Sequence, residues 1–277
     1  MHSRCKSLVL VLLSIAAALL LSPVEMFGAS QSPSGTKDPA ALAALSQMVA
    51  ATGWNPLNLP ADALITGNVT RSSDQVTSAV TLKIKGLGEF REDVQNSAGV
   101  TSTIVNNGQA AQLLPDGTLR VLGPQDAVSI WPVDVPVFSN LPSAASAPNV
   151  SVAYLGKETI NSSLCNKIQI SAQIQPIDPV SEITSRVATI TVWLDATTAL
   201  PVQLQYTRLA SNNPSATALH IRQFSNYQQV NGIQVAFTQQ EFMNGQLLYA
   251  FQFSAVNFNV GLTDSDFALP TAQQGGF

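Results

Sequence analysis

The run from Phe224 to Pro270 constrains the fold more than any other part of this chain. Two Asn-Gly pairs, Asn231-Gly232 and Asn244-Gly245, divide it into three segments with apolar residues at alternate positions. Asn-Gly supplies the two positive φ angles of a type I′ hairpin turn, so each pair predicts a tight antiparallel turn. We expect strands at 224–230, 233–243 and 246–260, of which the middle one would be about 36 Å long. Strands of that length twist and curl, so the run predicts a curved sheet.

The last of these strands changes parity along its length. Its apolar residues stand at odd positions up to Phe253 and at even positions from Val256 onward. Side chains of a regular strand alternate strictly between two faces, so such a change requires an extra residue. The sequence therefore predicts a β-bulge near Ser254 and Ala255.

An alternation of period two also organises the chain before this run, beginning near Leu64. Turns at Asn107-Gly108 and at 115–117 separate short strands. With the final run, the count is about ten or eleven antiparallel strands. We predict a mainly β fold: a single curved antiparallel sheet, an open half-barrel, covered by one or more helices. The expected earlier strands lie at about 76–84, 101–105, 109–114, 118–122, 150–155, 164–174, 189–194, 201–207 and 219–222.

One amphipathic helix is expected before the sheet. Asp38 is a typical N-cap, Pro39 a typical first helical residue and Gly53 a typical C-terminal cap. An ordinary packing helix and a lid over the sheet are both compatible with this pattern. The expected apolar stripe consists of Ala41, Leu42, Leu45, Met48 and Val49.

The segment 123–149 interrupts the strand pattern with five prolines. Proline removes a backbone donor and is excluded from central strands. The segment also contains Trp131, Phe138 and several valines, which is too apolar for a freely disordered loop. We expect a long connection that docks on the rest of the protein, over one opening of the sheet.

The first thirty residues predict export. Arg4 and Lys6 precede an apolar run of fourteen positions that would span about 21 Å as a helix, short of the roughly 30 Å hydrocarbon core of a bilayer. Small residues follow, so we expect a signal peptide at 1–30, cleaved near Ala29 or Ser30, and a periplasmic or extracellular protein. An uncleaved anchor is the alternative. The remaining divisions are a flexible linker at 31–37, one domain at 38–270 and a tail at 271–277.

Charge and cysteine content narrow the classes of partner. Removal of residues 1–30 lowers the basic count from 13 to 11 and the acidic count from 17 to 16, which gives a net charge of −5. This balance, without a basic cluster, argues against a nucleic-acid partner. Cys165 would be the one cysteine of the exported chain, so we expect no disulfide, within the chain or to a partner. A cysteine beside no histidine is expected to be inert.

The sequence contains no recognisable catalytic or metal motif. His220 would be the one histidine left after cleavage, and a strand histidine is usually structural. Asp264-x-Asp266 could bind a cation, but a turn that lets Phe267 dock is the favoured interpretation. Glu241 and Asp195 could serve as an acid and a base, although nothing in the sequence brings them together. We therefore expect no catalytic residue, no metal and no cofactor.

A series of short motifs marks the strand ends and turns in the second half of the chain. They are Thr191-Val-Trp-Leu-Asp195, Leu200-Pro201-Val202, Phe224-Ser-Asn-Tyr227, Val230-Asn-Gly232, Asn259-Val-Gly-Leu262 and Asp266-Phe-Ala-Leu-Pro270. In their order and spacing, these motifs resemble the LolA-like superfamily of periplasmic lipoprotein carriers, also described as outer-membrane lipoprotein-sorting proteins. The resemblance covers about 187–270, and the first half agrees only in pattern. It implies a half-barrel of about eleven strands, covered by helices, with an apolar cavity for acyl chains and a role in carrying lipids or lipoproteins or in sensing envelope state.

These observations favour a non-enzymatic carrier or sensor that binds an acyl-chain lipid or a lipoprotein and makes transient contact with envelope membranes. A secreted scaffold or interaction domain whose sheet is simply filled is the first alternative, and an envelope enzyme using acidic residues is the second. A dry core would contain the same residues as a cavity, so the ligand contacts stay an expectation. The candidates to line a ligand cavity are Leu82, Ile84, Val235, Phe237, Tyr249, Phe251 and Phe253.

Overall fold

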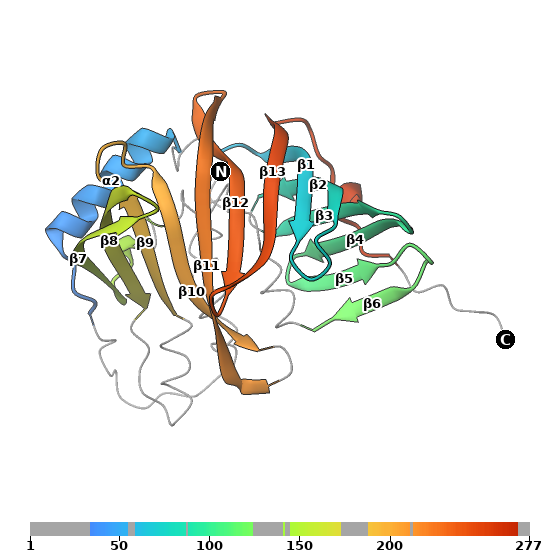
Figure 1. Ribbon diagram of the computed structural model, residues 1–277, viewed down its shortest axis with the longest axis horizontal. Coiled ribbons are helices and arrows are strands. Elements are labelled where there is room, and N and C mark those ends of the chain that lie inside the picture. Colours follow the sequence, from blue (N-terminus) through green and yellow to red (C-terminus); the bar gives the residue numbers. More distant parts are fainter. Residues whose placement is uncertain are drawn as a thin grey trace, which may run out of the picture.

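The computed structural model describes residues 34–54, 59–86, 88–123, 141, 145–172, 188–210 and 213–270. These residues form one sheet, one α-helix and one short 3₁₀ helix (Figure 1). The helices are α2 (Pro39–Thr52) and η1 (Asp264–Phe267). The strands are β1 (Asp62–Arg71), β2 (Thr77–Lys85), β3 (Glu89–Asn96), β4 (Gly99–Asn106), β5 (Gln109–Leu113), β6 (Leu119–Leu122), β7 (Val150–Ile160), β8 (Ser163–Ala172), β9 (Thr189–Asp195), β10 (Pro201–Ala210), β11 (Asn213–Val230), β12 (Ile233–Met243) and β13 (Gln246–Phe258).

The thirteen strands of the described residues form a single open sheet in the order β6-β5-β4-β3-β2-β1-β13-β12-β11-β10-β9-β8-β7. The chain enters near the middle at β1, runs outward to the edge strand β6, continues at the opposite edge with β7 and returns to β13 beside β1. All the pairings are antiparallel, and β6 and β7 do not pair with each other. Figure 1 shows the resulting curl. The predicted curved antiparallel half-barrel with a helix is confirmed.

The predicted turns are confirmed by their backbone angles. Asn231 and Gly232 have φ of 50° and 85°, and Asn244 and Gly245 have φ of 49° and 80°. Both pairs thus lie in the left-handed region, which asparagine and glycine enter at the least cost. The hairpins β11–β12 and β12–β13 follow from them.

The predicted bulge in β13 is also present. Opposite β1, Ala255 pairs with Thr66 and Phe253 pairs with Gly67, which leaves Ser254 as the extra residue. A Cβ atom on Gly67 would lie 2.3 Å from the carbonyl oxygen of Gln252, so only glycine fits at this close approach. The bulge brings Phe253 and Val256 to the same face, which explains the change of parity.

Two details of the strand prediction were wrong. The predicted count of ten or eleven was too low, because the expected strands did not include β1 or β3. In β1, Gly67 at the bulge interrupts the apolar alternation. In β3, Glu92 occupies the position between the buried Phe90 and Val94 on the inner side and hides the alternation. The expected strands 219–222 and 224–230 are one strand, β11, which runs through Arg222 and Phe224 without a turn.

The helix α2 has the predicted caps. The side chain of Asp38 accepts hydrogen bonds from the backbone N–H groups of Ala40 and Ala41, and Gly53 has φ of 71°. The buried face differs in part from the predicted stripe, because Leu42 is 37% exposed while Ala44 and Thr52 are buried. The stripe therefore lies one position further around the helix, at Ala41, Ala44, Leu45, Met48 and Thr52.

Two apolar clusters form the core. The helix-covered cluster joins α2 to strands β7 to β12 and consists of Ala41, Ala44, Leu45, Met48, Leu141, Ala145, Val150, Val152, Ile168, Ile170, Ile190, Val192, Leu194, Leu204, Phe224 and Ala236. The aromatic cluster joins strands β1 to β5 with β12 and β13 and consists of Trp54, Ala63, Ile65, Val69, Val80, Leu82, Ile84, Phe90, Val94, Val105, Ala110, Ile233, Val235, Phe237, Phe251, Phe253, Val256 and Phe258.

Both clusters contact the same face of the sheet, which we call the inner face. Gln239 of β12 lies directly opposite Phe224 on one side and Phe251 on the other, and residues directly opposite in antiparallel strands share a face. Phe224 belongs to the helix-covered cluster and Phe251 to the aromatic cluster.

The C-terminal segment docks on the outer side of β2 to β4. Lys83 and Lys85, which alternate with the inward-facing Leu82 and Ile84, form ion pairs with Asp266 and Asp264, respectively. Phe267 is fully buried in η1. The predicted turn that lets Phe267 dock is therefore confirmed, and the carboxylates that could have bound a cation are paired with lysines.

Several predictions concern residues outside the described ranges. These are the signal peptide at 1–30, the first three residues of the linker at 31–37, most of the proline-rich segment and the tail at 271–277. The described residues 34–37 of the predicted flexible linker are fixed along β7: the backbone N–H of Gly35 donates to the carbonyl of Pro148, and that of Val152 donates to the carbonyl of Thr36. In the part of the chain that the structure describes, no helix has the length and apolar character needed to cross a membrane.

Candidate functional site

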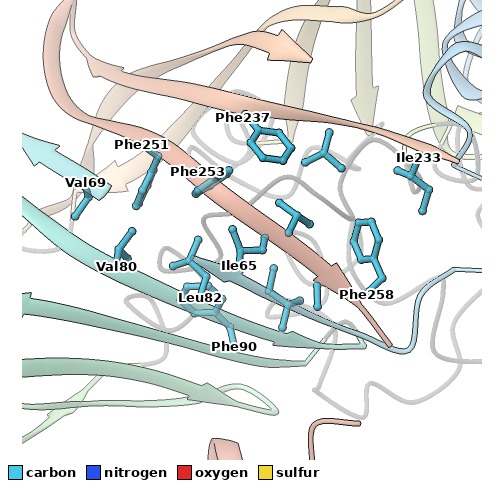
Figure 2. Packing of buried hydrophobic residues seen from close by; sticks show 14 of the residues in the cluster. Ile65, Val69, Val80, Leu82, Phe90, Ile233, Phe237, Phe251, Phe253 and Phe258 are labelled. Atoms are coloured by element: carbon cyan, nitrogen blue, oxygen red, sulfur yellow. The ribbon is translucent and has the colours of Figure 1, made fainter. Parts of the chain in front are cut away.

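The seven predicted ligand-contact residues come together in the structure. Six of them are buried members of the aromatic cluster, and Tyr249 is half-buried and packs against it. They come from β2 and from the hairpin β12–β13, which are far apart in sequence and lie on either side of β1 in the sheet. Figure 2 shows the labelled aromatic side chains gathered with Leu82 and Ile65 between these strands.

The aromatic rings of β13 form a continuous row. The ring centroids of Tyr249 and Phe251 are 5.1 Å apart, and those of Phe251 and Phe253 are 5.7 Å apart. At the far end, Trp54 meets Phe258 edge-on at 6.0 Å. Such contacts contribute beyond the burial of apolar area, and they give the row a defined surface against which a chain of methylenes could pack.

The helix α2 does not contribute to this cluster. Its buried residues, such as Leu45 and Met48, belong to the helix-covered cluster. The C-terminal end of α2 meets the β11–β12 turn, where a Cβ atom on Gly53 would lie 2.3 Å from the carbonyl oxygen of Gly232. Among the described residues of the segment between α2 and β1, Trp54 belongs to the aromatic cluster and Leu59 packs against it.

A second feature of the inner face, which we call the polar cluster, consists of Tyr206, His220, Arg222, Glu241 and Tyr249. The Oε2 atom of Glu241 accepts a hydrogen bond from Nε of Arg222 at 2.6 Å. Its Oε1 atom accepts one from the hydroxyl of Tyr206 at 2.7 Å and lies 2.7 Å from Nδ1 of His220. Arg222 and Glu241 are 2% and 1% exposed, so this is a buried ion pair with its hydrogen bonds supplied by neighbours.

The charge on Glu241 is strongly stabilised. Burial acts to raise the pKa of this carboxyl, but the charge of Arg222 and the hydrogen bonds from His220, Tyr206 and Arg222 outweigh it and lower the pKa to about 2. A carboxylate with so low a pKa holds no proton at neutral pH and is a weak base, so it is poorly suited to general acid–base catalysis.

The proposed acid–base pair of Glu241 and Asp195 is not brought together. Asp195 lies in the turn after β9, where its carboxylate accepts hydrogen bonds from the backbone of Thr197 and Thr198. It follows the inward-facing Leu194 and therefore belongs to the outer side, whereas Glu241 faces inward.

The other predicted chemical candidates have structural surroundings. His220 is buried in the polar cluster, stacked on Tyr206 with 5.3 Å between the ring centroids. Cys165 is fully buried, and burial raises the pKa of its thiol, which disfavours the reactive thiolate. The described part of the chain holds no group of three or more His, Cys, Asp or Glu side chains arranged to bind a metal ion.

Sequence reasoning missed the polar cluster, although one signal could have revealed part of it. A two-residue turn at Asn231-Gly232 pairs Val230 with Ile233, and counting outward from that pair places Arg222 opposite Glu241. The position of Tyr249 could not be counted in the same way, because the β12–β13 pairing shifts between Glu241 and Phe242.

Comparisons with known proteins agree with this architecture. No family model and no curated protein matches the sequence. Among solved structures, the chain is similar to a domain from Vibrio parahaemolyticus named as an outer membrane lipoprotein-sorting protein domain, with 15% identity over 82% of this chain and 96% of that one and a TM-score of 0.52.

Two further structures extend the comparison. A DUF1329 family protein from Desulfovibrio piger has 13% identity over 82% of this chain and 97% of its own, with a TM-score of 0.53. A LolA superfamily protein from Nitrosomonas europaea has 9% identity over 82% of this chain and 97% of its own, with a TM-score of 0.45. With its open antiparallel sheet, its single described α-helix and its apolar inner face, the chain shares the fold of the Vibrio and Desulfovibrio structures.

Proposed function

We propose that the protein is a non-enzymatic carrier or sensor of the cell envelope that binds the acyl chain of a lipid or lipoprotein on its inner face. The observation that carries the proposal is the aromatic cluster: a row of rings on β13, facing Leu82 and Ile84 of β2, over which α2 does not pack. The domain at 38–270 would act after export directed by the signal peptide at 1–30, in the periplasm or outside the cell, with transient contact to envelope membranes.

The chemistry of the cluster suits an acyl chain. Each methylene that leaves water for an apolar surface contributes about 0.8 kcal/mol. Ten methylenes would thus contribute about 8 kcal/mol, from which the entropic cost of binding is subtracted. The fold agrees with this function, because the similar Vibrio domain is named for lipoprotein sorting.

A scaffold with a filled sheet is the second candidate, and one observation favours it. The six apolar candidates are already shielded from solvent, with Phe237 at 6% and Phe253 at 7% exposure. A carrier of this kind must separate the walls of the cluster to admit its ligand, whereas a scaffold would keep them packed. The two functions therefore differ in how the cluster responds to added volume.

The change Val235→Phe separates these functions. If the cluster opens for an acyl chain, the added ring fills the space of the ligand, and binding falls at least tenfold while the free energy of unfolding changes little. If the cluster is a filled core, overpacking lowers the free energy of unfolding by about 1–3 kcal/mol. The measurement pairs displacement of a fluorescent fatty acid with urea denaturation.

The matched control is Val192→Phe, at a fully buried position of the helix-covered cluster. Overpacking there is expected to destabilise the protein by about 1–3 kcal/mol and to leave the affinity of the folded fraction unchanged. Native mass spectrometry of wild-type residues 31–277, prepared from an envelope fraction without detergent, supplies the direct test. A co-purifying acyl-chain lipid near unit stoichiometry supports the carrier, and a clean mass together with no probe binding contradicts it.

A further inference from the structure

The inner face changes its chemistry along β12 and β13. From the Asn231-Gly232 turn onward, the buried inward residues of β12 are first Val235 and Phe237 and then Gln239 and Glu241. On β13 the apolar row ends at Phe251, and the next inward residue is Tyr249, directly opposite Glu241. The aromatic cluster therefore leads directly into the polar cluster, an arrangement complementary to a molecule with one apolar and one polar end.

Tyr249 lies at the boundary between the two clusters. Its ring contacts Phe251, and its hydroxyl oxygen accepts a hydrogen bond from Nη2 of Arg222 at 3.3 Å. The hydroxyl proton has no acceptor among the described residues, and the side chain is only half-buried. Burial raises the pKa of Tyr249 to about 12, so the hydroxyl keeps its proton at neutral pH and stays a donor.

Guanidinium groups lie on the same part of the sheet as Tyr249. Arg71 lies directly opposite Tyr249 in β1, and Arg208 stacks over the ring of Tyr206 with 4.9 Å from Cζ to the centroid. Glu92 faces the same side from β3, and burial raises the pKa of its carboxyl, which weakens its tendency to carry charge.

The buried pair of Arg222 and Glu241 gives this boundary a fixed geometry. An isolated buried ion pair contributes little net stability, because desolvation offsets the attraction. Here the pair orients Nη2 of Arg222 toward the Tyr249 hydroxyl. Because the hydroxyl oxygen accepts this bond, the hydroxyl proton stays available for a further acceptor.

We propose that Tyr249, supported by Arg222 and Arg208, binds an anionic oxygen of the ligand headgroup, either a carboxylate or a phosphate, while the acyl chain packs along the aromatic cluster. This inference rests on the proposed function, since it specifies which acyl-chain ligands the same face selects. Hydrogen bonds from polarised donors to anionic oxygens are among the stronger ones in proteins, so Tyr249 would distinguish anionic from neutral ligands with the same chain.

The test compares three ligands with the same sixteen-carbon chain: palmitate, hexadecyl phosphate and hexadecanol, each in monomeric form. Dissociation constants are measured by calorimetry for wild-type residues 31–277 and for Tyr249→Phe. The substitution is expected to weaken binding of the preferred anionic ligand roughly tenfold or more and to change hexadecanol by less than about twofold. Whichever anion binds more tightly to the wild type identifies the carboxylate or the phosphate as the headgroup.

Two further variants keep the test interpretable. Tyr154→Phe is the matched control, because the Tyr154 hydroxyl donates to Asn166 in the distant β7–β8 hairpin and its loss should leave all three affinities unchanged. Arg208→Gln retains a polar side chain at a half-buried position. This change is expected to reduce the difference in affinity between the anionic ligands and hexadecanol. It also tests the proposal if Tyr249→Phe does not fold.

The outcomes separate this inference from the proposed function. Equal effects of Tyr249→Phe on charged and neutral ligands, or no effect on any of them, would overturn the headgroup site while the acyl-chain carrier stands. Equal affinity of the wild type for all three ligands would overturn it as well. Failure of all three ligands to bind would overturn the proposed function itself.

Discussion

The two halves of the sheet have the same alternation of side chains, but they bury their inner faces with different partners. In the half formed by β7 to β11, small and aliphatic residues pack under α2, a helix with well-formed caps at both ends. In the half formed by β1 to β5 with β12 and β13, aromatic rings face one another, and the row ends in buried charges. The first arrangement is typical of a fixed core, and the second suits a binding surface.

This difference assigns separate tasks to one continuous sheet. Gln239 connects the two clusters through its direct neighbours Phe224 and Phe251, so neither half is an independent domain. We infer that the helix-covered half maintains the curvature and that the aromatic half responds to ligand.

The largest effect is expected from Glu241→Leu at the polar end of the aromatic half. This change leaves the charge of Arg222 buried without its partner, which should lower the free energy of unfolding by about 3–5 kcal/mol. The double variant Arg222→Leu with Glu241→Leu removes both charges and should recover most of that loss. Urea denaturation measures the free energy of unfolding of both variants. A Glu241→Leu variant as stable as the wild type would contradict the account.

In the helix-covered half, Met48→Ala is expected to lower the free energy of unfolding by about 2–5 kcal/mol, because Met48 is fully buried and a cavity replaces its side chain. The affinity for a fluorescent fatty acid, measured on the folded protein, should stay within about twofold of the wild type. A large loss of affinity would show that the two halves do not have separate tasks.

Acid should weaken the polar end of the aromatic half. Glu241 has its pKa lowered from 4.5 to about 2 in the folded protein, so folding favours its ionised form. Its contribution, about 3 kcal/mol, is therefore fully present above the unfolded pKa of 4.5 and is lost as the pH falls toward 2. Melting temperatures between pH 7 and 3 should fall more steeply for the wild type than for the Arg222→Leu, Glu241→Leu double variant. Parallel curves would argue against the buried pair as the source.

The smallest effect is expected from Phe251→Leu in the aromatic row. The change removes ring contacts with Tyr249 and Phe253 and should lower the free energy of unfolding by about 1 kcal/mol. Because the same ring is expected to contact the acyl chain, the affinity for the fatty-acid probe should fall several-fold. Leu204→Val serves as the control on the helix-covered side, with a comparable loss of stability and unchanged affinity.

Local signals made much of the fold predictable from the sequence. The Asn-Gly turns require φ angles that few other pairs adopt, and the change of parity after Phe253 requires a bulge wherever the strand pairs. Asp38 and Gly53 identified the ends of α2 because capping depends on nearby residues alone. The seven ligand-contact candidates came together because each followed from the alternation of its own strand.

The features that escaped prediction depend on distant partners. β3 carries Glu92 on its inner side, and only the neighbouring strands reveal that Phe90 and Val94 are buried there. The contact between Arg222 and Tyr249 depends on a register shift between β12 and β13, which no local sequence pattern predicts. The division of the inner face into two clusters likewise depends on where α2 docks. The sequence of α2 specifies only which side of the helix is apolar.

The most direct test of the central claim is photo-crosslinking with a fatty acid that carries a diazirine on its acyl chain. After irradiation of wild-type residues 31–277 and proteolysis, mass spectrometry locates the labelled peptides. The account predicts labels on β1, β2, β12 and β13, with unlabelled palmitate competing for them. Labels confined to α2 and β7 to β9, or labels that excess palmitate does not displace, would contradict the assignment of binding to the aromatic half.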